Sequence, residues 1–330
     1  MKQIVFICMV CCLFVSCKQT YQAETGSIFR TYYQVKYQSD ISLLPKIQAE
    51  LAAFDLSLNP FNPNSILAKV NRNEVVEVDR WFTVVFNRAM EISEQSNGRF
   101  DVTVAPLINL WGFGFEQYNE VTPEIIDSLK SFIGYRKVRL DDRHVIKDDP
   151  RIMLNFSAIA KGYACDVIAA LLEREGVKNY LVEIGGEVVA KGKNARGACW
   201  QIGINEPEDE ENYMQNTYKE IVRLCGKNGI ATSGDYRNYY IKDGKRFAHT
   251  IDPITGYPVD HNLLSATIIA PDCMTADAFA TAFMAMGMEE ACRMANQIRE
   301  IEYYLIYAKE DNSVGIMHSQ GMTPKLFNRK

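Results

Sequence analysis

Two kinds of hydrophobic periodicity alternate along this chain. Stretches in which apolar positions repeat every second residue, rich in β-branched and aromatic side chains, predict strands. Stretches in which they repeat every third or fourth residue predict amphipathic helices. The predicted strands are residues 28–37, 135–140, 145–146, 180–184, 188–192, 200–204, 221–224, 265–270, 301–307 and 314–317. The predicted helices are residues 41–54, 83–96, 121–132, 166–176, 275–287 and 288–297, with a short one that Ser65 caps.

The N-terminal residues 1–17 have the layout of a secretory signal. The apolar run from Ile4 to Val15 is shorter than the roughly 20 residues that span a bilayer. Ser16 directly before Cys17 resembles a bacterial lipobox, in which the cysteine is acylated, although Phe14 leaves cleavage by the general signal peptidase open. We therefore predict a lipoprotein signal in 1–17 with lipidation at Cys17, a polar tether in 18–26 and one domain in 27–330. The protein would be lipid-anchored on the periplasmic side of a bacterial cell envelope.

Composition narrows the function classes. A net charge of −5 with scattered basic residues argues against nucleic acid as a partner. Beyond the signal there are five widely spaced cysteines without a CxxC pair, which favours buried thiols over a disulfide framework or a zinc site. They are Cys165, Cys199, Cys225, Cys273 and Cys292. Four histidines without paired spacing argue against a histidine-rich transition-metal site.

A histidine leads into a stiff turn at residues 247–258, FAHTIDPITGYP. Pro253 and Gly256 predict a rigid loop after Asp252, so His249 is held in one place. One interpretation is a loop histidine in ordinary surface contacts. The other is a side chain positioned for chemistry, which the polar turn at residues 231–236 and the helix that begins near Thr275 favour.

That helix carries two oxygen-bearing side chains four residues apart. Asp277 and Thr281 share one helical edge. Asp277 could simply stabilise the first turn through the helix dipole, with Thr281 in the helix interior. The functional interpretation is a pair of hard oxygen ligands, the kind that Mg²⁺ prefers.

Two other segments have the composition of ligand-binding loops. Residues 99–114 place glycines among aromatic residues, which suits either close core packing or open main-chain N–H groups beside aromatic faces. Residues 153–166 cluster small residues around Lys161 and Gly162 before a helix, where main-chain donors and the helix dipole suit an anion.

Seven motifs occur in one order: NSILAKVN, GRFDVTVAPLINLWGFG, SAIAKGYACD, LVEIGGEV, ATSGDY, HTIDPITGYPV and ADAFATAFMAMG. The set resembles the ApbE family, the FAD:protein FMN transferases. The resemblance implies an α+β fold, one compact T-fold-like unit of mixed or antiparallel sheets with flanking helices. It also implies an extracytoplasmic Mg²⁺-dependent enzyme with FAD as substrate. The FMN half of FAD moves onto a Ser or Thr hydroxyl of a partner protein and AMP is released. The expected acceptors are subunits of sodium-pumping NADH:quinone oxidoreductase and of the Rnf complex, with the pattern D-x-x-[ST]-G-A-[ST].

The resemblance also assigns roles to single residues. Asp277, Thr281 and the main-chain carbonyl of Ala160 are the expected metal ligands, and His249 is the expected residue that handles the proton of the acceptor hydroxyl. Lys161 is expected near the phosphates. The expected FAD contacts are Asp101, Val102, Thr103, Ser157, Tyr163 and Ile251.

One departure from the family pattern follows Ser57. The segment LNPFNPNS is two residues longer than in many members, and Asn59 stands where others carry a Tyr against the flavin. A smaller polar residue there would admit water, so a Mg²⁺-dependent FAD pyrophosphatase is one alternative function. A lipoprotein that binds FAD without chemistry is another, although His249, Asp277 and Thr281 together argue against pure binding.

Overall fold

The structure is a computed structural model that describes residues 20–114, 120–205, 218–234, 239–242, 245–311 and 313–327. The predicted signal, Cys17 and the acidic run 206–211 lie outside the described residues. Within the described ranges, no helix is both long enough and apolar enough to cross a membrane.

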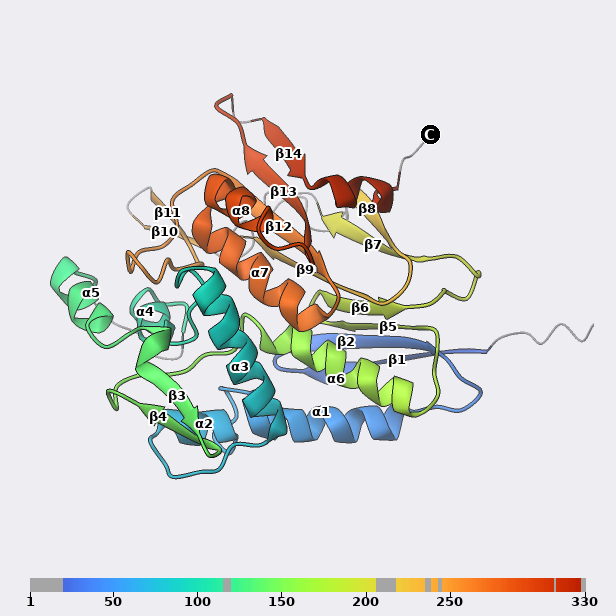
Figure 1. Ribbon diagram of the computed structural model, residues 1–330, viewed down its shortest axis with the longest axis horizontal. Coiled ribbons are helices and arrows are strands. Elements are labelled where there is room, and N and C mark those ends of the chain that lie inside the picture. Colours follow the sequence, from blue (N-terminus) through green and yellow to red (C-terminus); the bar gives the residue numbers. More distant parts are fainter. Residues whose placement is uncertain are drawn as a thin grey trace, which may run out of the picture.

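A single sheet of eight strands runs through the protein, and every neighbouring pair in it is antiparallel (Figure 1). In spatial order the strands are β1 (Tyr21–Ile28), β2 (Thr31–Gln38), β5 (Tyr180–Ile184), β6 (Glu187–Lys191), β9 (Asn228–Gly234), β12 (Leu263–Ala270), β13 (Glu302–Ala308) and β14 (Val314–His318). The described residues also form two-stranded pairs: β3 (Val138–Asp141) with β4 (His144–Lys147), β7 (Trp200–Asn205) with β8 (Tyr218–Leu224), and β10 (Tyr239–Lys242) with β11 (Lys245–Ala248).

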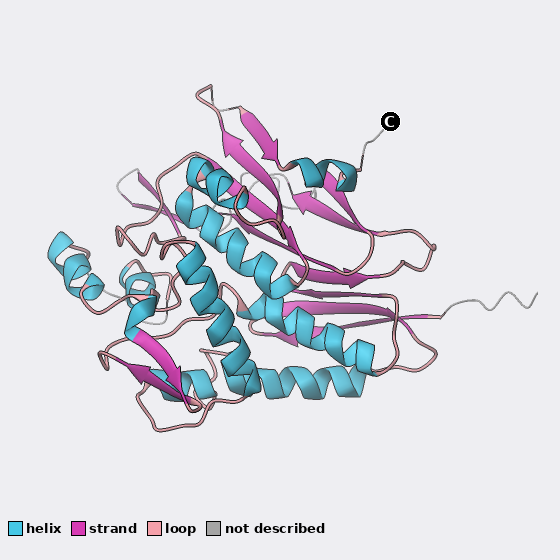
Figure 2. Cartoon of the chain, in the orientation of Figure 1, coloured by secondary structure: helices cyan, strands magenta, loops and turns pink. Residues whose placement is uncertain are grey.

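Helices gather on one face of this sheet (Figures 1 and 2). The helices of the described residues are α1 (Leu44–Leu58), α2 (Ile66–Asn71), α3 (Arg80–Gln95), α4 (Ala105–Leu110), α5 (Pro123–Lys130), α6 (Ala160–Arg174), α7 (Cys273–Met286) and α8 (Met288–Ala295). There are also two 3₁₀ turns, η1 (Tyr135–Lys137) and η3 (Gln320–Lys325), and η3 lies on the other face of the sheet. Helix α6 contacts β5 and β6, and α7 contacts β9 and β12. The predicted α+β fold with antiparallel sheets and flanking helices is therefore confirmed.

Alternation along the strands divides the apolar residues between two cores. On β2, Tyr33, Val35 and Tyr37 are buried toward the helices and join the main core. A smaller second core lies on the opposite face, where the β7–β8 hairpin and η3 cover the sheet. Its buried members are Leu181, Val188, Ala190, Trp200, Ile204, Val222, Leu224, Ile230, Ile269, Tyr304, Ile306 and Met322.

Three predictions made from sequence need correction. The polar tether predicted for 18–26 is wrong from Tyr21 onward, because β1 begins there and pairs along its whole length with β2. The helix that was predicted to begin near Thr275 begins at Cys273, and its cap is not Thr275 but Asp272, whose side chain accepts a hydrogen bond from Thr275 N. Cys199 and Cys225 form a disulfide that ties the ends of β7 and β8 together, whereas Cys165 and Cys273 are buried thiols as predicted.

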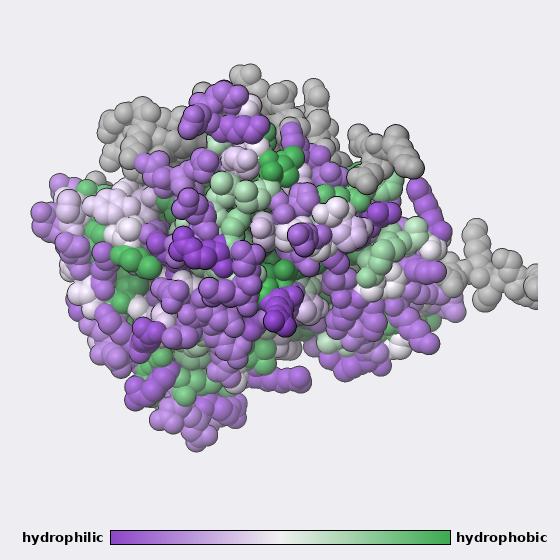
Figure 3. All heavy atoms as spheres, turned by 45° about the horizontal axis from the view of Figure 1, so that its top comes forward, coloured by the Kyte–Doolittle hydropathy of each residue, from purple (hydrophilic) through white to green (hydrophobic). Residues whose placement is uncertain are grey.

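Strands β6 and β9 part from each other at the start of β6. Strand β6 pairs with β9 only from Val188 to Ala190, while β9 continues to Gly234 beside β12. The Gly185-Gly186 turn, with positive φ at both glycines, ends the β5–β6 hairpin opposite this free stretch of β9. A cavity occupies the space, and both segments line it. The surface elsewhere is largely hydrophilic on the face that Figure 3 shows, with smaller apolar areas between.

Candidate active site

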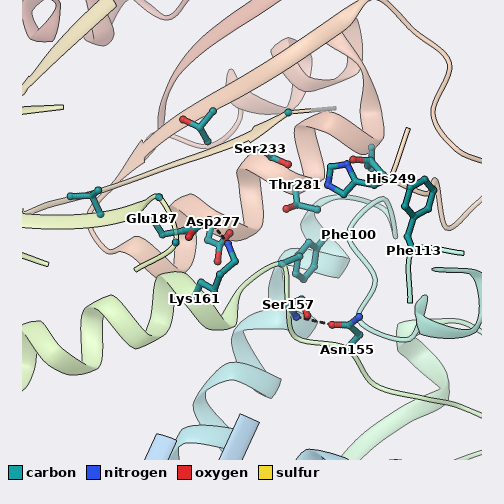
Figure 4. Close-up of a pocket in the computed structure, with 18 of the residues that line it drawn as sticks. Phe100, Phe113, Asn155, Ser157, Lys161, Glu187, Ser233, His249, Asp277 and Thr281 are labelled. Carbon is teal, nitrogen blue, oxygen red and sulfur yellow. Dashed lines mark hydrogen bonds and ion pairs between the residues drawn. The ribbon is translucent and has the colours of Figure 1, made fainter. Parts of the chain in front are cut away.

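The cavity measures about 1020 Å³. That is at the upper end of the range of roughly 300–1,000 Å³ for small-molecule and cofactor sites, so it suits a ligand as large as a dinucleotide. Side chains from the helix starts, the strand ends and the loop after β11 meet in it (Figure 4). Those with polar groups toward the cavity include Asn155, Ser157, Lys161, Glu187, Ser233, His249, Asp277 and Thr281.

Two carboxylates and one ammonium group form a charged cluster at one end of the cavity. Lys161 Nζ makes an ion pair with Glu187 Oε1, and Asp277 lies beside them (Figure 4). Burial raises the pKa of Glu187 to about 7, although Lys161 opposes this. Burial also raises the pKa of Asp277, against the charge of Lys161. With both carboxylates ionised the cluster carries one net negative charge in a buried place, which favours a cation.

The cluster also contains an unpaired acceptor. Glu187 Oε2 is buried and receives no hydrogen bond from any described residue. Asp277 Oδ2 accepts a hydrogen bond from Gly162 N at 2.9 Å, and no described residue donates to Oδ1. Because buried acceptors are normally satisfied, the unpaired Oε2 of Glu187 indicates a bound partner. No group of three His, Cys, Asp or Glu side chains in the described ranges could hold a metal ion by itself. A cation here would therefore need hydroxyl, carbonyl or ligand oxygens besides a carboxylate.

Helices α6 and α7 approach closely to build this end of the cavity. A Cβ on Gly162 would lie 2.3 Å from the carbonyl oxygen of Cys273 and 2.8 Å from Asp277 Cβ, so only glycine fits. The carboxylate of Asp166, one turn further along α6, accepts from the main-chain N–H groups of Cys273 and Met274 at the start of α7. These contacts fix Asp277 relative to Lys161.

The loop after β11 is rigid, as its Pro and Gly predict. Asp252 accepts from Arg99 Nη1 at 2.7 Å and from Ile254 N, and Trp111 Nε1 donates to the carbonyl of Gly256 at 2.8 Å. The ring of His249 lies edge-on to Phe113, 6.3 Å between centroids, and lines the cavity (Figure 4). His249 is thus held at the cavity by a loop with fixed geometry.

The predicted residues divide into two groups. His249, Asp277, Thr281, Lys161, Ser157, Val102 and Ile251 all line the cavity. Asp101 lines it too, but its carboxylate is used internally, because it accepts from Thr103 and from Tyr135 N. Thr103 is fully buried, and its hydroxyl also accepts from Gly134 N, so its side chain holds the loop and does not line the cavity.

Three other predicted residues lie outside the cavity lining. Tyr163 packs against Phe54 of α1, with 5.7 Å between ring centroids. Ala160 opens α6 and packs on the main core, whereas its neighbour Ala158 lines the cavity. Asn59 donates to Asp55 and accepts from Phe61 N, so its amide shapes the loop.

Sequence reasoning missed several lining residues. Phe61, two positions after Asn59, reaches the cavity with the Arg30 guanidinium 4.2 Å from its ring centroid. Glu187 stands in the quoted LVEIGGEV motif, and an acid directly before an apolar strand run was the available signal. Tyr32, Gln34 and Lys36 alternate along β2, and this period of two marks the face opposite the core.

Comparison with known proteins agrees with this arrangement. The sequence model of the ApbE family matches residues 29–305. The chain is 36% identical over 309 residues to the FAD:protein FMN transferase of Haemophilus influenzae, covering 88% of this chain and 87% of that one. It is 39% identical over 258 residues to the one of Salmonella typhimurium, covering 76% and 72%.

Solved structures give the same result. The flavin transferase ApbE from Vibrio cholerae superposes with a TM-score of 0.83 at 32% identity, covering 93% of this chain and 99% of that one. The apo form of the flavinyl transferase ApbE from Pseudomonas stutzeri superposes with a TM-score of 0.82 at 30% identity, covering 93% and 97%.

Proposed function

The chain belongs to the ApbE family, and we propose that it transfers FMN from FAD to a Ser or Thr hydroxyl of an acceptor protein, with Mg²⁺ bound and AMP released. The observation that carries the proposal is the convergence of His249, Lys161, Asp277 and Thr281 on one cavity large enough for a dinucleotide. The proposed acceptors are subunits of NADH:quinone oxidoreductase or Rnf type.

The cluster fits a magnesium ion. Asp277 Oδ1 and the Thr281 hydroxyl line the cavity four residues apart on α7, and a main-chain carbonyl from the turn at Ala160 would complete the protein's share. The unpaired oxygen of Glu187, and the net negative charge that the cluster carries once both carboxylates are ionised, support a cation at this end. Bound Mg²⁺ supplies charge neutralisation on the pyrophosphate of FAD and polarises its phosphoryl oxygens.

Lys161, which lines the same cavity, is proposed to contact the same phosphates. Burial lowers the pKa of Lys161, but the charges of Glu187 and Asp277 outweigh this and hold it above its ordinary value. Lys161 therefore stays protonated throughout the neutral range. A fixed ammonium group beside a pyrophosphate stabilises the negative charge that develops on the leaving AMP.

His249 is placed to accept a proton from the acceptor. In the proposed step the Ser or Thr oxygen attacks the phosphorus of the FMN half, and its proton passes to the imidazole. A new phosphoester bond forms between the acceptor oxygen and FMN. The P–O bond to the AMP phosphate breaks, and AMP leaves with the bridging oxygen. The rigid turn from Asp252 to Gly256 keeps the imidazole in position during this exchange.

The remaining lining residues suit the flavin nucleotide. Val102 and Ile251 are apolar and buried at the cavity wall, and Ser157 is an exposed hydroxyl there. Phe61, in place of Asn59, offers an aromatic face against which an isoalloxazine ring would stack. The pyrophosphatase alternative was based on the small polar Asn59, which would admit water beside the flavin. With the aromatic ring of Phe61 in that place, this argument no longer applies.

We also propose that the protein acts outside the cytoplasm, anchored through a lipid on Cys17. The disulfide between Cys199 and Cys225 supports an oxidising compartment, because such bonds are rare in the cytosol.

The test is incubation of the protein with FAD, Mg²⁺ and a peptide carrying the D-x-x-Thr-G-A-Thr pattern. We expect covalent flavin fluorescence on the peptide and one AMP released per flavin attached. AMP release that is equal with and without peptide, and leaves the peptide unlabelled, would identify a pyrophosphatase. FAD that stays intact in both samples would identify a binding protein without chemistry.

A further inference from the structure

One edge of strand β7 opens into the cavity. The cavity lining includes Gln201, Ile202, Gly203 and Asn205. The reaction proposed above uses groups on α6, α7 and the 249–253 loop and gives these four residues no role. In the described part of the chain, β7 pairs with β8 alone, so its other edge has no strand beside it. An uncovered strand edge presents main-chain donors and acceptors to whatever lies next to it.

The pairing of β8 shows which main-chain groups point into the cavity. Phe327 N donates to the carbonyl of Ile221, and Ile221 N donates to the side chain of Glu220, so the main chain of Ile221 faces away from β7. Ile221 lies opposite Gly203. In an antiparallel pair, two opposite residues that do not bond to each other both direct their N–H and C=O groups outward. The N–H and C=O of Gly203 therefore point to the free edge, and those of Gln201, two residues earlier, do the same.

The floor of the cavity on this face of the sheet is mostly polar. Gln34 and Lys36 of β2 lie opposite Glu183 and Leu181 of β5, and all four line the cavity on the face of the sheet turned away from the helices. The adjoining part of the same face is the apolar second core, which β7 and β8 cover. The part of this face that β7 and β8 do not cover therefore lines the cavity beside β7. Its polar side chains, Gln34, Lys36 and Glu183, are half-buried.

We propose that the acceptor segment bearing the Ser or Thr hydroxyl binds here in extended form, as an additional strand on the free edge of β7. The proposal rests on the transferase function proposed above and names how that reaction selects its protein substrate. Gln201 and Gly203 offer N–H and C=O pairs about 7 Å apart, the two-residue repeat of a strand. A peptide matches that repeat and a flavin nucleotide does not.

Gly203 strengthens this assignment. A glycine inside a strand often marks a place where another backbone approaches closely, and Gly203 stands at the centre of the edge that no described strand covers. Main-chain pairing supplies affinity that tolerates different side chains, while the polar floor of Gln34, Lys36 and Glu183 contacts alternate residues of the added strand. The edge and His249 line the same cavity, so a peptide bound there would bring its hydroxyl to the reacting phosphate.

The first experiment is an N-methyl scan of the acceptor peptide. In an added strand, only every second peptide N–H bonds to the edge of β7, so methylation should lower kcat/KM for FMN transfer at alternate positions. We expect roughly a tenfold loss or more at the sensitive positions and little change at the others. If methylation lowered kcat/KM equally at all positions, or at no position, strand addition would be overturned while the transferase function would still stand. Failure to transfer FMN to any peptide, methylated or not, would contradict the transferase function itself.

The second experiment removes one donor from the protein. Gly203→Pro eliminates the N–H that faces the cavity without touching a bond between β7 and β8, and Gly203→Ala is the matched control that keeps it. We expect Gly203→Pro to raise KM for the peptide about tenfold relative to Gly203→Ala, with FAD affinity unchanged by flavin fluorescence quenching. A weaker FAD affinity in Gly203→Pro would place the nucleotide on this edge, and a concentration-dependent dimer of the wild type that Gly203→Pro abolishes would place a second copy there. Either result would overturn the proposal.

Discussion

The main-chain N–H of Gly162 donates a hydrogen bond to Oδ2 of Asp277, with 2.9 Å between the two atoms. The two residues are 115 positions apart in sequence, and this bond joins the first turn of α6 to the second turn of α7. It orients the carboxylate that the cavity offers to a cation, and it depends on the absence of a side chain at position 162.

Gly162→Ala should therefore weaken both the fold and the site. The added methyl would meet the carbonyl oxygen of Cys273 at 2.3 Å, so α6 and α7 must separate. We expect the free energy of unfolding to fall by about 1–3 kcal/mol, the usual cost of overpacking, together with a loss of FMN transfer. Urea denaturation measures the first. Gly197→Ala, in an exposed loop with open space around it, is the control. Its positive φ of 74° should cost some stability through backbone strain, but transfer should be unchanged.

Asp277→Asn should separate metal binding from structure. The amide oxygen of Asn can still accept from Gly162 N, so the fold is kept, while the charge that attracts a cation is lost. We expect turnover to fall by roughly 10³-fold, because several kcal/mol of charge stabilisation disappear. Mg²⁺ should raise the melting temperature of the wild type and not that of the variant. Normal turnover of Asp277→Asn at saturating Mg²⁺ would rule out the assignment.

His249→Ala should distinguish transfer from hydrolysis. A hydroxyl nucleophile needs a base at the moment of attack, so transfer to an acceptor peptide should fall by roughly 10²–10⁴-fold. Any hydrolysis of FAD should fall less, since water can also be activated by a metal ion. The measurement is covalent flavin fluorescence on the peptide beside AMP release without it. Equal losses in both activities would make His249 a binding residue.

Stability should depend on pH through Asp166. Burial raises the pKa of Asp166 to about 7, Asp272 adds to this, and the N–H groups of Cys273 and Met274 oppose it. The folded protein therefore holds a proton that the unfolded chain has already released above about pH 4. The free energy of unfolding should fall as pH rises from about 4 to 7, by up to about 1.4 kcal/mol per pH unit, and then level off.

Asp166→Asn tests whether the free energy of unfolding falls with rising pH because of Asp166. The variant should be less stable than the wild type at pH 5, because its NH₂ group faces a main-chain N–H, but its stability should change less between pH 5 and 7. Urea denaturation at pH 5, 6 and 7 measures both. An unchanged slope in the variant would show that Asp166 does not titrate in this range.

The lipid anchor is tested by labelling. A fatty-acid analogue fed to cells that produce the full chain should tag the wild type and not Cys17→Ser. An untagged wild type would identify cleavage by the general signal peptidase and a secreted protein without an anchor.

The sequence predicted those parts of the site whose geometry is local. The turn at His249 follows from one Pro and one Gly, and Ser65 caps α2 as its position indicates. Asp277 and Thr281 share a helical edge because helices have a fixed period. The structural role of Asp101 could not be predicted from local sequence. Its carboxylate accepts a hydrogen bond from the N–H of Tyr135, which lies 34 residues later in the chain.

The same reason accounts for the other corrections. Glu187 of β6 is paired with Lys161 of α6, which lies 26 residues earlier, and only the packing of α6 on β6 brings them together. Cys199 and Cys225 are bonded because the register of β7 and β8 places Trp200 opposite Leu224. Strand β1 was read as a tether because its side chains are polar, yet main-chain pairing with β2 does not depend on side-chain polarity.

The small second core gives the β7–β8 hairpin a support of its own. Residues that position Asp277, Lys161 and His249 belong to the helical side of the sheet and to the 249–258 loop, whereas the hairpin rests on the opposite face and is closed by its own disulfide. Substitutions on the hairpin can accumulate over evolution without disturbing the reacting groups. Descendants of such a fold could thus change the proteins they modify while keeping one unchanged reaction.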